Sequence, residues 1–377
     1  MKKSVKILTI GLFASLGLAN AQDINQLKFS SFESNVARFE AYKKYGFLDK
    51  KGNTFGNRYD NAFEVSEGLI AVCKGKKWGF VDKDGKEVIS INYDEVQNFS
   101  QGLSAVRVGE KWGYIDKKGR FKIEPTYEDA LGFTENLAFV RMYGKWAIID
   151  KKGRQIAHPQ FDKAESFAEG LASVAIDGKY GYVDKKGKVA ITLRYKSAHS
   201  FVGGRAAVRM ADSKKWGFID AKDGLVVADI YDEVVNYSEG LAVVRSRNKW
   251  GIIDKEGGEV IPVIYDFIEG VSDGLVVVKI QNKYGIVNKF GKEVTPVKYD
   301  NIWGFSEGLA CVSINNKFGY IDKSGQETIP LIYDLAYSFS DGLARVSIFG
   351  REGFVNKKGK ELFIKNQPFD NTLSSRK

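Results

Sequence analysis

A stretch of about eleven residues recurs along the chain at a nearly constant spacing. Residues 110–120 read EKWGYIDKKGR, and close copies stand at 77–86 (KWGFVDKDGK), 179–188 (KYGYVDKKGK), 249–258 (KWGIIDKEGG) and 317–326 (KFGYIDKSGQ). The aromatic residue of the stretch falls at positions 45, 78, 112, 146, 180, 216, 250, 284 and 318, in steps of 33 to 36 residues. A fixed period of this length is the signature of a repeat architecture, in which each copy packs against its neighbours.

Each copy has the composition of short strands separated by turns. In residues 237–270, YSEGLAVVRSRNKWGIIDKEGGEVIPVIYDFIEG, runs of β-branched and aromatic residues are interrupted by Gly, Asn and Asp, without helical periodicity. We predict a first strand over 241–245, a tight hairpin turn, a second strand with the Trp-Gly pair, an Asp-Lys-Lys-Gly turn, and a third strand that ends at Tyr-Asp. The predicted fold class is all-β, with three antiparallel strands and a corner in each repeat.

Irregular copies indicate which parts of the repeat are turns and edges. The 36-residue step adds two residues at 211–214, in the predicted hairpin turn, and the 33-residue step loses one between Gly52 and Tyr59. Asn136 replaces the usual corner glycine, which predicts a left-handed backbone there. Proline cannot donate a backbone hydrogen bond, so its recurrence near the end of the third strand predicts a sheet edge. These prolines stand at 125, 159, 262, 296 and 330.

The order of these features resembles the WG-repeat (KWG-repeat) family over nearly the whole chain. The resemblance rests on the Trp-Gly pair, its two turns, the Tyr-Asp pair and the Gly-Leu-Ala corner, which recur in order. It implies an all-β repeat architecture that serves interaction, and no single activity. Ala147 in place of the glycine, Glu352 in place of the aromatic residue and Arg205 in place of leucine depart from the pattern, and we expect those copies to pack less well.

A three-stranded meander of this length cannot bury enough apolar surface to fold alone, so we expect neighbouring copies to stack. The motif aromatic residue is predicted to lie in the core between copies, and its glycine to let a ring or backbone approach closely. We count ten repeats over 32–370, with a lead-in at 22–31 and a flexible tail at 371–377. Propellers usually have four to eight four-stranded blades. We therefore expect tandem three-stranded repeats stacked into an open twisted superhelix, with a closed propeller-like ring as the alternative.

Residues 1–21 have the pattern of a secretory signal. Lys2, Lys3 and Lys6 precede a short apolar stretch that ends in Ala-Asn-Ala at 19–21. We predict cleavage after Ala21, which gives a bacterial protein that is periplasmic or secreted and does not span the membrane. An uncleaved anchor is the alternative, but the apolar run is short for a membrane span.

Charged and chemically reactive residues do not form a recognisable catalytic pattern. The net charge is +10, but the lysine doublets occupy the centres of turns, which indicates solvated turns rather than a nucleic-acid patch. His158 and His199 stand at non-equivalent repeat positions, and the recurrent aspartates before Lys-Lys-Gly are predicted turn formers. Cys73 and Cys311 are seven repeats apart and should stay free. We predict no catalytic residue, no metal site and no cofactor, so the chain is expected not to be an enzyme.

Binding is therefore the favoured class of function. Trp303 and Tyr337 stand at equivalent positions of adjacent repeats, two residues before the corner aromatic residue, and are placed to form a stacking shelf for a sugar or a peptide aromatic. With His199, in the same column, they are the candidate ligand-binding residues; the alternative is that they pad the end of the stack. We predict a monomeric, non-catalytic scaffold that binds protein through a repeat face, and as the alternative a module that binds cell-envelope glycan through exposed aromatic shelves.

Overall fold

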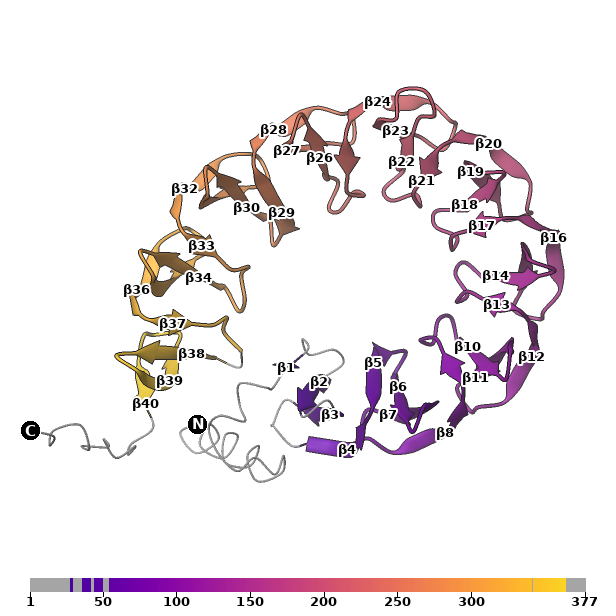
Figure 1. Cartoon of the computed structure of the whole chain (residues 1–377), viewed down its shortest axis with the longest axis horizontal. Helices are drawn as coiled ribbons and strands as arrows, with labels where there is room; N and C mark the ends of the chain where they lie inside the picture. The colour runs from indigo at the N-terminus through magenta and orange to yellow at the C-terminus, as the bar shows by residue number, and fades with distance from the viewer. Residues whose placement is uncertain (1–27, 30–35, 42–43, 50–53, 341, 364–377) are drawn as a thin grey trace, which may run out of the picture. The chain divides into compact units, whose positions relative to one another are not determined.

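The computed structural model describes residues 28–29, 36–41, 44–49, 54–340 and 342–363, and the secondary-structure elements within these ranges are all β-strands (Figure 1). They form ten four-stranded antiparallel sheets in chain order within the described residues. The predicted all-β repeat class is confirmed. The predicted signal and tail lie outside the described residues, as does the predicted lead-in apart from Lys28–Phe29.

The chain divides into two compact units, Met1–Phe201 and Val202–Lys377. The strands of the first unit are β1 (Lys28–Phe29), β2 (Val36–Ala41), β3 (Lys44–Asp49), β4 (Thr54–Tyr59), β5 (Asn61–Ser66), β6 (Leu69–Lys74), β7 (Lys77–Asp82), β8 (Glu87–Tyr93), β9 (Glu95–Val96), β10 (Leu103–Val108), β11 (Lys111–Asp116), β12 (Phe121–Tyr127), β13 (Asp129–Ala130), β14 (Leu137–Met142), β15 (Lys145–Asp150), β16 (Gln155–Phe161), β17 (Lys163–Ala164), β18 (Leu171–Ile176), β19 (Lys179–Asp184), β20 (Val189–Tyr195) and β21 (Ser197–Ala198).

The second unit repeats the same pattern of strand lengths. Its strands are β22 (Ala206–Arg209), β23 (Trp216–Ile219), β24 (Leu225–Tyr231), β25 (Glu233–Val234), β26 (Ala242–Ser246), β27 (Lys249–Ile253), β28 (Glu259–Tyr265), β29 (Phe267–Ser272), β30 (Leu275–Ile280), β31 (Lys283–Asn288), β32 (Glu293–Tyr299), β33 (Asn301–Ile302), β34 (Leu309–Ile314), β35 (Lys317–Asp322), β36 (Glu327–Tyr333), β37 (Leu335–Ala336), β38 (Leu343–Ile348), β39 (Arg351–Asn356) and β40 (Glu361–Phe363).

The sheet β9–β12 shows how a repeat becomes a sheet. Its order is β12-β11-β10-β9, so the predicted three-strand meander is present as β10, β11 and β12. The expectation of only three strands needs a correction, because the residues after Tyr-Asp form a short fourth strand, with Val96 opposite Val106. Backbone hydrogen bonds from Asp94 to Arg107 and from Gln97 to Ala105 flank this pairing. Two residues are too few to show the alternating pattern by which a strand is recognised in a sequence.

The turns and edges follow the sequence predictions. Asn315 and Asn316, between β34 and β35, have φ values of 50° and 60°, as a tight hairpin turn requires. The third strand, such as β12, is an edge strand and carries two register shifts where it pairs with β11, and Pro125 lies in this irregular part. The added residues of the 36-residue repeat lie in the turn between β22 and β23, and β4 is the shortened third strand.

Neighbouring sheets pack face to face, as predicted for the repeats. Tyr114 of β11 and Phe133 of the next sheet make an edge-to-face contact, with ring centroids 4.7 Å apart. On the opposite face, Val106 and Ile115 join a cluster with Phe80 of the preceding sheet. Both faces of a sheet are therefore buried against neighbours, which is why the chain repeats the same apolar residues.

The deepest aromatic residue of the repeat is not the motif tryptophan. Trp112 is buried, whereas Trp146 and Trp250 are partly buried and pack against core clusters between sheets, so the predicted position in the core holds but the burial of most copies is incomplete. The fully buried ring stands two residues later, on the same face of the strand, as in Tyr114 and Tyr320, both 0% exposed. The motif tryptophan lies next to the hairpin turn, where the sheet ends and the burial is incomplete.

The lysine that begins the motif and the aspartate of Tyr-Asp bind one another across adjacent repeats. Asp94 accepts a hydrogen bond from Lys77 Nζ at 2.6 Å and another from the backbone N–H of Gly109 at 2.8 Å. Asp266 and Asp334 make the corresponding two contacts in the second unit. These hydrogen bonds, led by the one from lysine, lower the pKa of each of the three carboxyls. The aspartate thus ties one sheet to the hairpin turn of the next.

We expect acid to weaken the fold through these aspartates. Their pKa is lower in the folded chain than in the unfolded chain, where aspartate titrates near about 3.9. The stabilisation is therefore present above that value and is lost as the pH falls through the lower folded pKa. Urea midpoints measured between pH 7 and pH 2 test this expectation. A triple variant, Asp94→Asn, Asp266→Asn and Asp334→Asn, should lose less stability in acid; an identical acid loss would contradict the assignment.

Candidate functional site

The polar residues that recur in every repeat are largely used by the fold itself. Asp116 Oδ1 accepts hydrogen bonds from the backbone N–H groups of Lys118 and Arg120, which confirms its predicted role as a turn former. At the corner, Glu67 accepts from Gly102 N–H and pairs with Lys117 Nζ at 3.0 Å, both in the next repeat. Candidate binding residues are therefore sought where a repeat departs from the pattern.

The two aromatic residues of the predicted shelf are half-exposed, and each has one intramolecular partner. Trp303 is 40% exposed, and its ring lies 5.5 Å from that of Phe318 in the same sheet. Tyr337 is 49% exposed, with the Arg345 guanidinium 5.4 Å from its ring centroid. The structure places them after β33 and β37, in adjacent sheets of the second unit, and their ligand-binding role stays a prediction.

His199 lies in the first unit, after β21, and is partly buried. Its backbone carbonyl accepts a hydrogen bond from the Tyr182 hydroxyl at 2.7 Å. His199 belongs to the first compact unit, whereas Trp303 and Tyr337 belong to the second. Its predicted role in binding is likewise untested.

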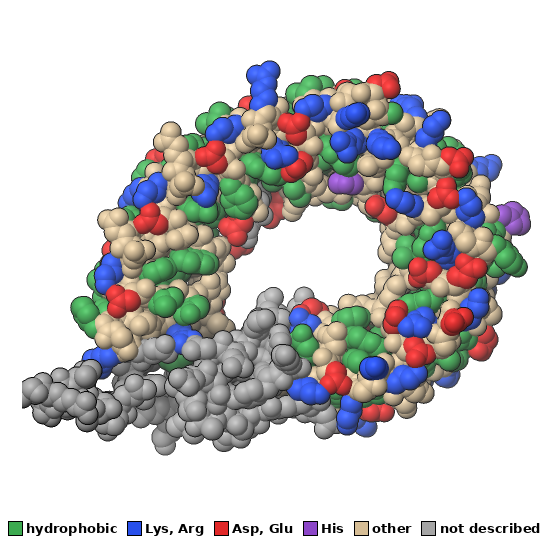
Figure 2. Space-filling view, in the orientation of Figure 1, with side chains coloured by type: hydrophobic (Ala, Val, Ile, Leu, Met, Phe, Trp, Pro, Cys, Tyr) green, Lys and Arg blue, Asp and Glu red, His purple; other side chains and the backbone are tan. Residues whose placement is uncertain are grey.

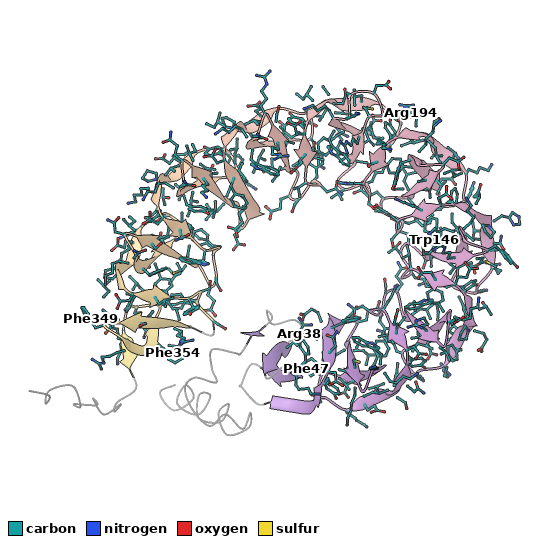
Figure 3. The ribbon with its side chains drawn as sticks, viewed as in Figure 1. Arg38, Phe47, Trp146, Arg194, Phe349 and Phe354 are labelled. Atoms are coloured by element: carbon teal, nitrogen blue, oxygen red, sulfur yellow. The ribbon has the colours of Figure 1, made fainter. Side chains whose placement is uncertain are left out.

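A groove of about 280 Å³ opens between the sheets β13–β16 and β17–β20 of the first unit, and its lining includes Trp146, which is labelled in Figure 3. Half-buried Trp146 lies on one side and half-buried Tyr180 on the other. Lys163, Ala164, Glu165 and Ser173 complete the lining. The Lys163 ammonium lies 5.7 Å from the Tyr180 ring centroid, and Glu165 Oε2 accepts a hydrogen bond from the Ser200 hydroxyl at 2.9 Å. Two aromatic rings and a pair of opposite charges thus meet in one depression.

Two substitutions within the repeat leave this groove open. Tyr180 pairs across the strands with Ala175, whereas five of the equivalent aromatic residues pair with a cationic side chain. Those partners are Arg107, Arg141, Arg209, Arg245 and Lys279. The second substitution is Glu165, in the column that holds Trp303. None of the groove residues was a predicted candidate, because the predicted candidates were large side chains that depart from the repeat. The available signal was Ala175, a small residue at a position that holds a cation in five other repeats.

Three aromatic side chains lie on the tips of turns. Tyr143 and Phe349 occupy equivalent hairpin turns and are 86% and 83% exposed, with φ values of 52° and 50°. Phe290, in the second turn of its repeat, is 75% exposed. Equivalent hairpin positions hold Gly75, Gly109, Asp177, Arg247, Gln281 and Asn315. These residues were not predicted either, although Tyr143 and Phe349 are aromatic residues at a position that elsewhere holds Gly, Asp, Asn, Arg or Gln.

The remaining groups do not define a reactive centre in the part of the chain that the structure describes. Cys73 and Cys311 are free, as predicted, and both are buried; burial raises the pKa of Cys311 to about 12, which keeps its thiol protonated. Among the described residues, no group of three or more His, Cys, Asp or Glu side chains is placed to hold a metal ion. On the face shown in Figure 2, basic and acidic side chains are interspersed. The described residues also contain no helix of the length and apolarity needed to cross a membrane.

The family described as WG containing repeat matches nine consecutive segments of the chain, at 45–78, 78–112, 112–146, 147–180, 180–214, 216–250, 250–284, 284–318 and 318–348. The chain belongs to this family of β-repeat proteins. No curated protein matches the sequence significantly.

Solved structures of low sequence identity resemble the fold. A eukaryotic initiation factor matches with a TM-score of 0.51 and 10% identity, over 88% of this chain and 96% of that one. PorZ, a bacterial surface component of the type-IX secretion system of Porphyromonas gingivalis, matches with a TM-score of 0.31 and 11% identity, over 84% and 53% of the two chains. An extracellular domain from B. thetaiotaomicron matches with a TM-score of 0.24 and 8% identity, over 90% and 66%. The first similarity concerns the fold alone.

Proposed function

We propose that the protein is a secreted, non-catalytic scaffold that binds a protein partner through one surface of the first unit. This binding surface consists of Tyr143, Trp146, Lys163, Glu165 and Tyr180. Tyr143 stands in the turn that leads into β15, three residues before Trp146, so the Cα atoms of the two residues are at most about 11 Å apart. Secretion is supported by the signal pattern of residues 1–21.

The conformation of Tyr143 is the observation that carries the proposal. A left-handed backbone disfavours a large side chain, and Gly, Asn and Asp adopt it at lower cost. Tyr143 nevertheless has a φ of 52° and is 86% exposed, so it contributes little burial to the fold in return. Backbone strain without local benefit supports a functional role, and exposed tyrosine is a residue type enriched in protein interfaces.

Tyr143→Asn tests this function. Asparagine adopts a left-handed backbone at lower cost than tyrosine. We therefore expect the free energy of unfolding, measured with urea, to stay unchanged or to rise by up to about 1 kcal/mol. Capture of envelope proteins by the immobilised chain should fall at least tenfold. Phe290→Asn, at a highly exposed aromatic residue of the other unit, is the matched control and should capture normally.

The identity of the captured material decides between the two functional classes. Proteins that are retained by the wild type and the control, and lost in Tyr143→Asn, support the proposal. Equal capture by all three chains contradicts it. Retention of cell-envelope glycan in place of protein would instead favour the glycan-binding alternative, for which the half-exposed rings of Trp303 and Tyr337 are the candidate shelf.

A further inference from the structure

The groove beside Tyr180 lacks the aromatic ring that two other repeats supply from within, although the Lys163 ammonium lies 5.7 Å from the Tyr180 ring centroid. In each of four other repeats a side chain of the same chain covers the motif aromatic residue. Two of these covering groups are cations: Arg245 lies 5.6 Å from the Trp250 ring centroid, and Lys279 lies 5.1 Å from that of Tyr284. Both cations come from the strand position directly opposite the aromatic residue.

The other two repeats use an aromatic ring. Where the opposite strand residue is short, as with Cys73 and Ser313, the covering side chain comes from the repeat position two residues before the corner aromatic residue. We call this position the corner column. Phe63 lies 4.7 Å from the Trp78 ring, and Trp303 lies 5.5 Å from the Phe318 ring. A short strand residue is thus accompanied by an aromatic residue in the corner column.

The repeat of Tyr180 has the short strand residue without the ring. Ala175 is opposite Tyr180, and Glu165 stands in the corner column. Glu165 and Trp303 are equivalent in backbone position, because the Glu165 N–H donates to Ser173 O and the Trp303 N–H donates to Cys311 O, both at 2.9 Å. The groove is the space that a ring in this column fills elsewhere.

We propose that this groove binds an aromatic side chain of the partner protein, in the place that Phe63 and Trp303 fill within their own repeats. This inference rests on the proposed function. A partner cation is less favoured, because Lys163 already lies over Tyr180 and would repel it. An aromatic ring would lie between Trp146 and Tyr180, and the rim offers Lys163 as a donor to a partner carbonyl and Glu165 as an acceptor from a partner N–H.

The test uses the full chain and a short peptide with one aromatic residue, acetyl-Gly-Gly-(4-fluoro-Phe)-Gly-Gly-amide, observed by fluorine NMR. The wild type should broaden the fluorine signal. Glu165→Trp copies Trp303 and fills the groove from within, so it should weaken peptide binding at least tenfold while the chain stays folded. Glu269→Trp is the matched control, because it changes the same column where Lys279 already covers Tyr284, and it should bind like the wild type.

Ala175→Arg is a second way to fill the groove, because it introduces the cation that five other repeats carry at this strand position. It should also weaken peptide binding at least tenfold. Loss of binding in both filled variants and its retention in Glu269→Trp support the proposal. The proposal is overturned if the wild type does not broaden the fluorine signal, or if all variants broaden it equally. Neither result bears on the Tyr143→Asn experiment. If acetyl-arginine amide at equal concentration displaces the peptide, the groove binds a cation. If an N-acetylglucosamine trimer binds and the peptide does not, the groove binds a glycan. Either result overturns the proposal.

Discussion

Gly113→Val should lower the free energy of unfolding by about 3 kcal/mol, which is the upper range for forcing extra atoms into a packed structure. A Cβ atom added at Gly113 would lie 2.6 Å from Ile123 O and 2.7 Å from Pro125 N. Both atoms belong to the backbone of β12, so no flexible side chain is available to move aside. The edge strand would have to separate from β11, and the cluster that includes Tyr114 and Ile123 would open.

Ala147→Gly is the matched control at the equivalent position of the next repeat. This copy already holds a Cβ, and its third strand carries Ala157 where β12 carries Ile123. Removing the methyl group should change stability by only about 0.5–1 kcal/mol, the usual cost of glycine in a strand. Urea unfolding followed by circular dichroism measures both variants. If Gly113→Val were as stable as Ala147→Gly, the close approach of β12 would not be the reason for the glycine.

Tyr320→Ala should cost about 3–5 kcal/mol, as large-to-small changes at aromatic core positions do. Tyr320 is 0% exposed, its ring makes an edge-to-face contact with Phe339 at 4.8 Å, and its hydroxyl donates to Tyr337 O at 2.7 Å. Burial raises the pKa of Tyr320 well above its ordinary value, so the hydroxyl remains a donor at neutral pH. The substitution would leave a cavity between two sheets and an unpaired carbonyl oxygen.

Two variants separate these contributions. Tyr320→Phe keeps the ring and removes the hydrogen bond, so it should cost about 1 kcal/mol. Trp303→Ala, at a half-exposed ring of the same unit, should cost under about 1 kcal/mol. Hydrogen exchange at the amides of β35 gives a local measurement, since repeat arrays can open one unit at a time. A larger loss in Trp303→Ala than in Tyr320→Ala would reverse the assignment of core and surface.

Most residues of the candidate site could be recognised in the sequence only once each repeat position had been placed in the three-dimensional structure. Ala175 and Glu165 are unremarkable residues in a strand and a corner. Their consequence depends on the cross-strand pairing of Ala175 with Tyr180 and on the position of Trp146 in the neighbouring sheet. The same holds for Tyr143, whose exposure and positive φ are properties of a folded turn.

The sequence by itself determined the repeat, the all-β class and the turns. Backbone requirements act within a few residues: positive φ at Asn136 and at the Asn315–Asn316 turn, and proline on an edge strand, can each be predicted from local residue type. Only the tertiary structure decided that Glu95–Val96 adds a fourth strand, that Tyr114 and not the motif tryptophan is the most deeply buried ring, and that Asp94 ties Lys77 to the next hairpin turn. The physical reason is that these features arise from contacts between successive repeats, and burial depends on which neighbouring surface each side chain meets.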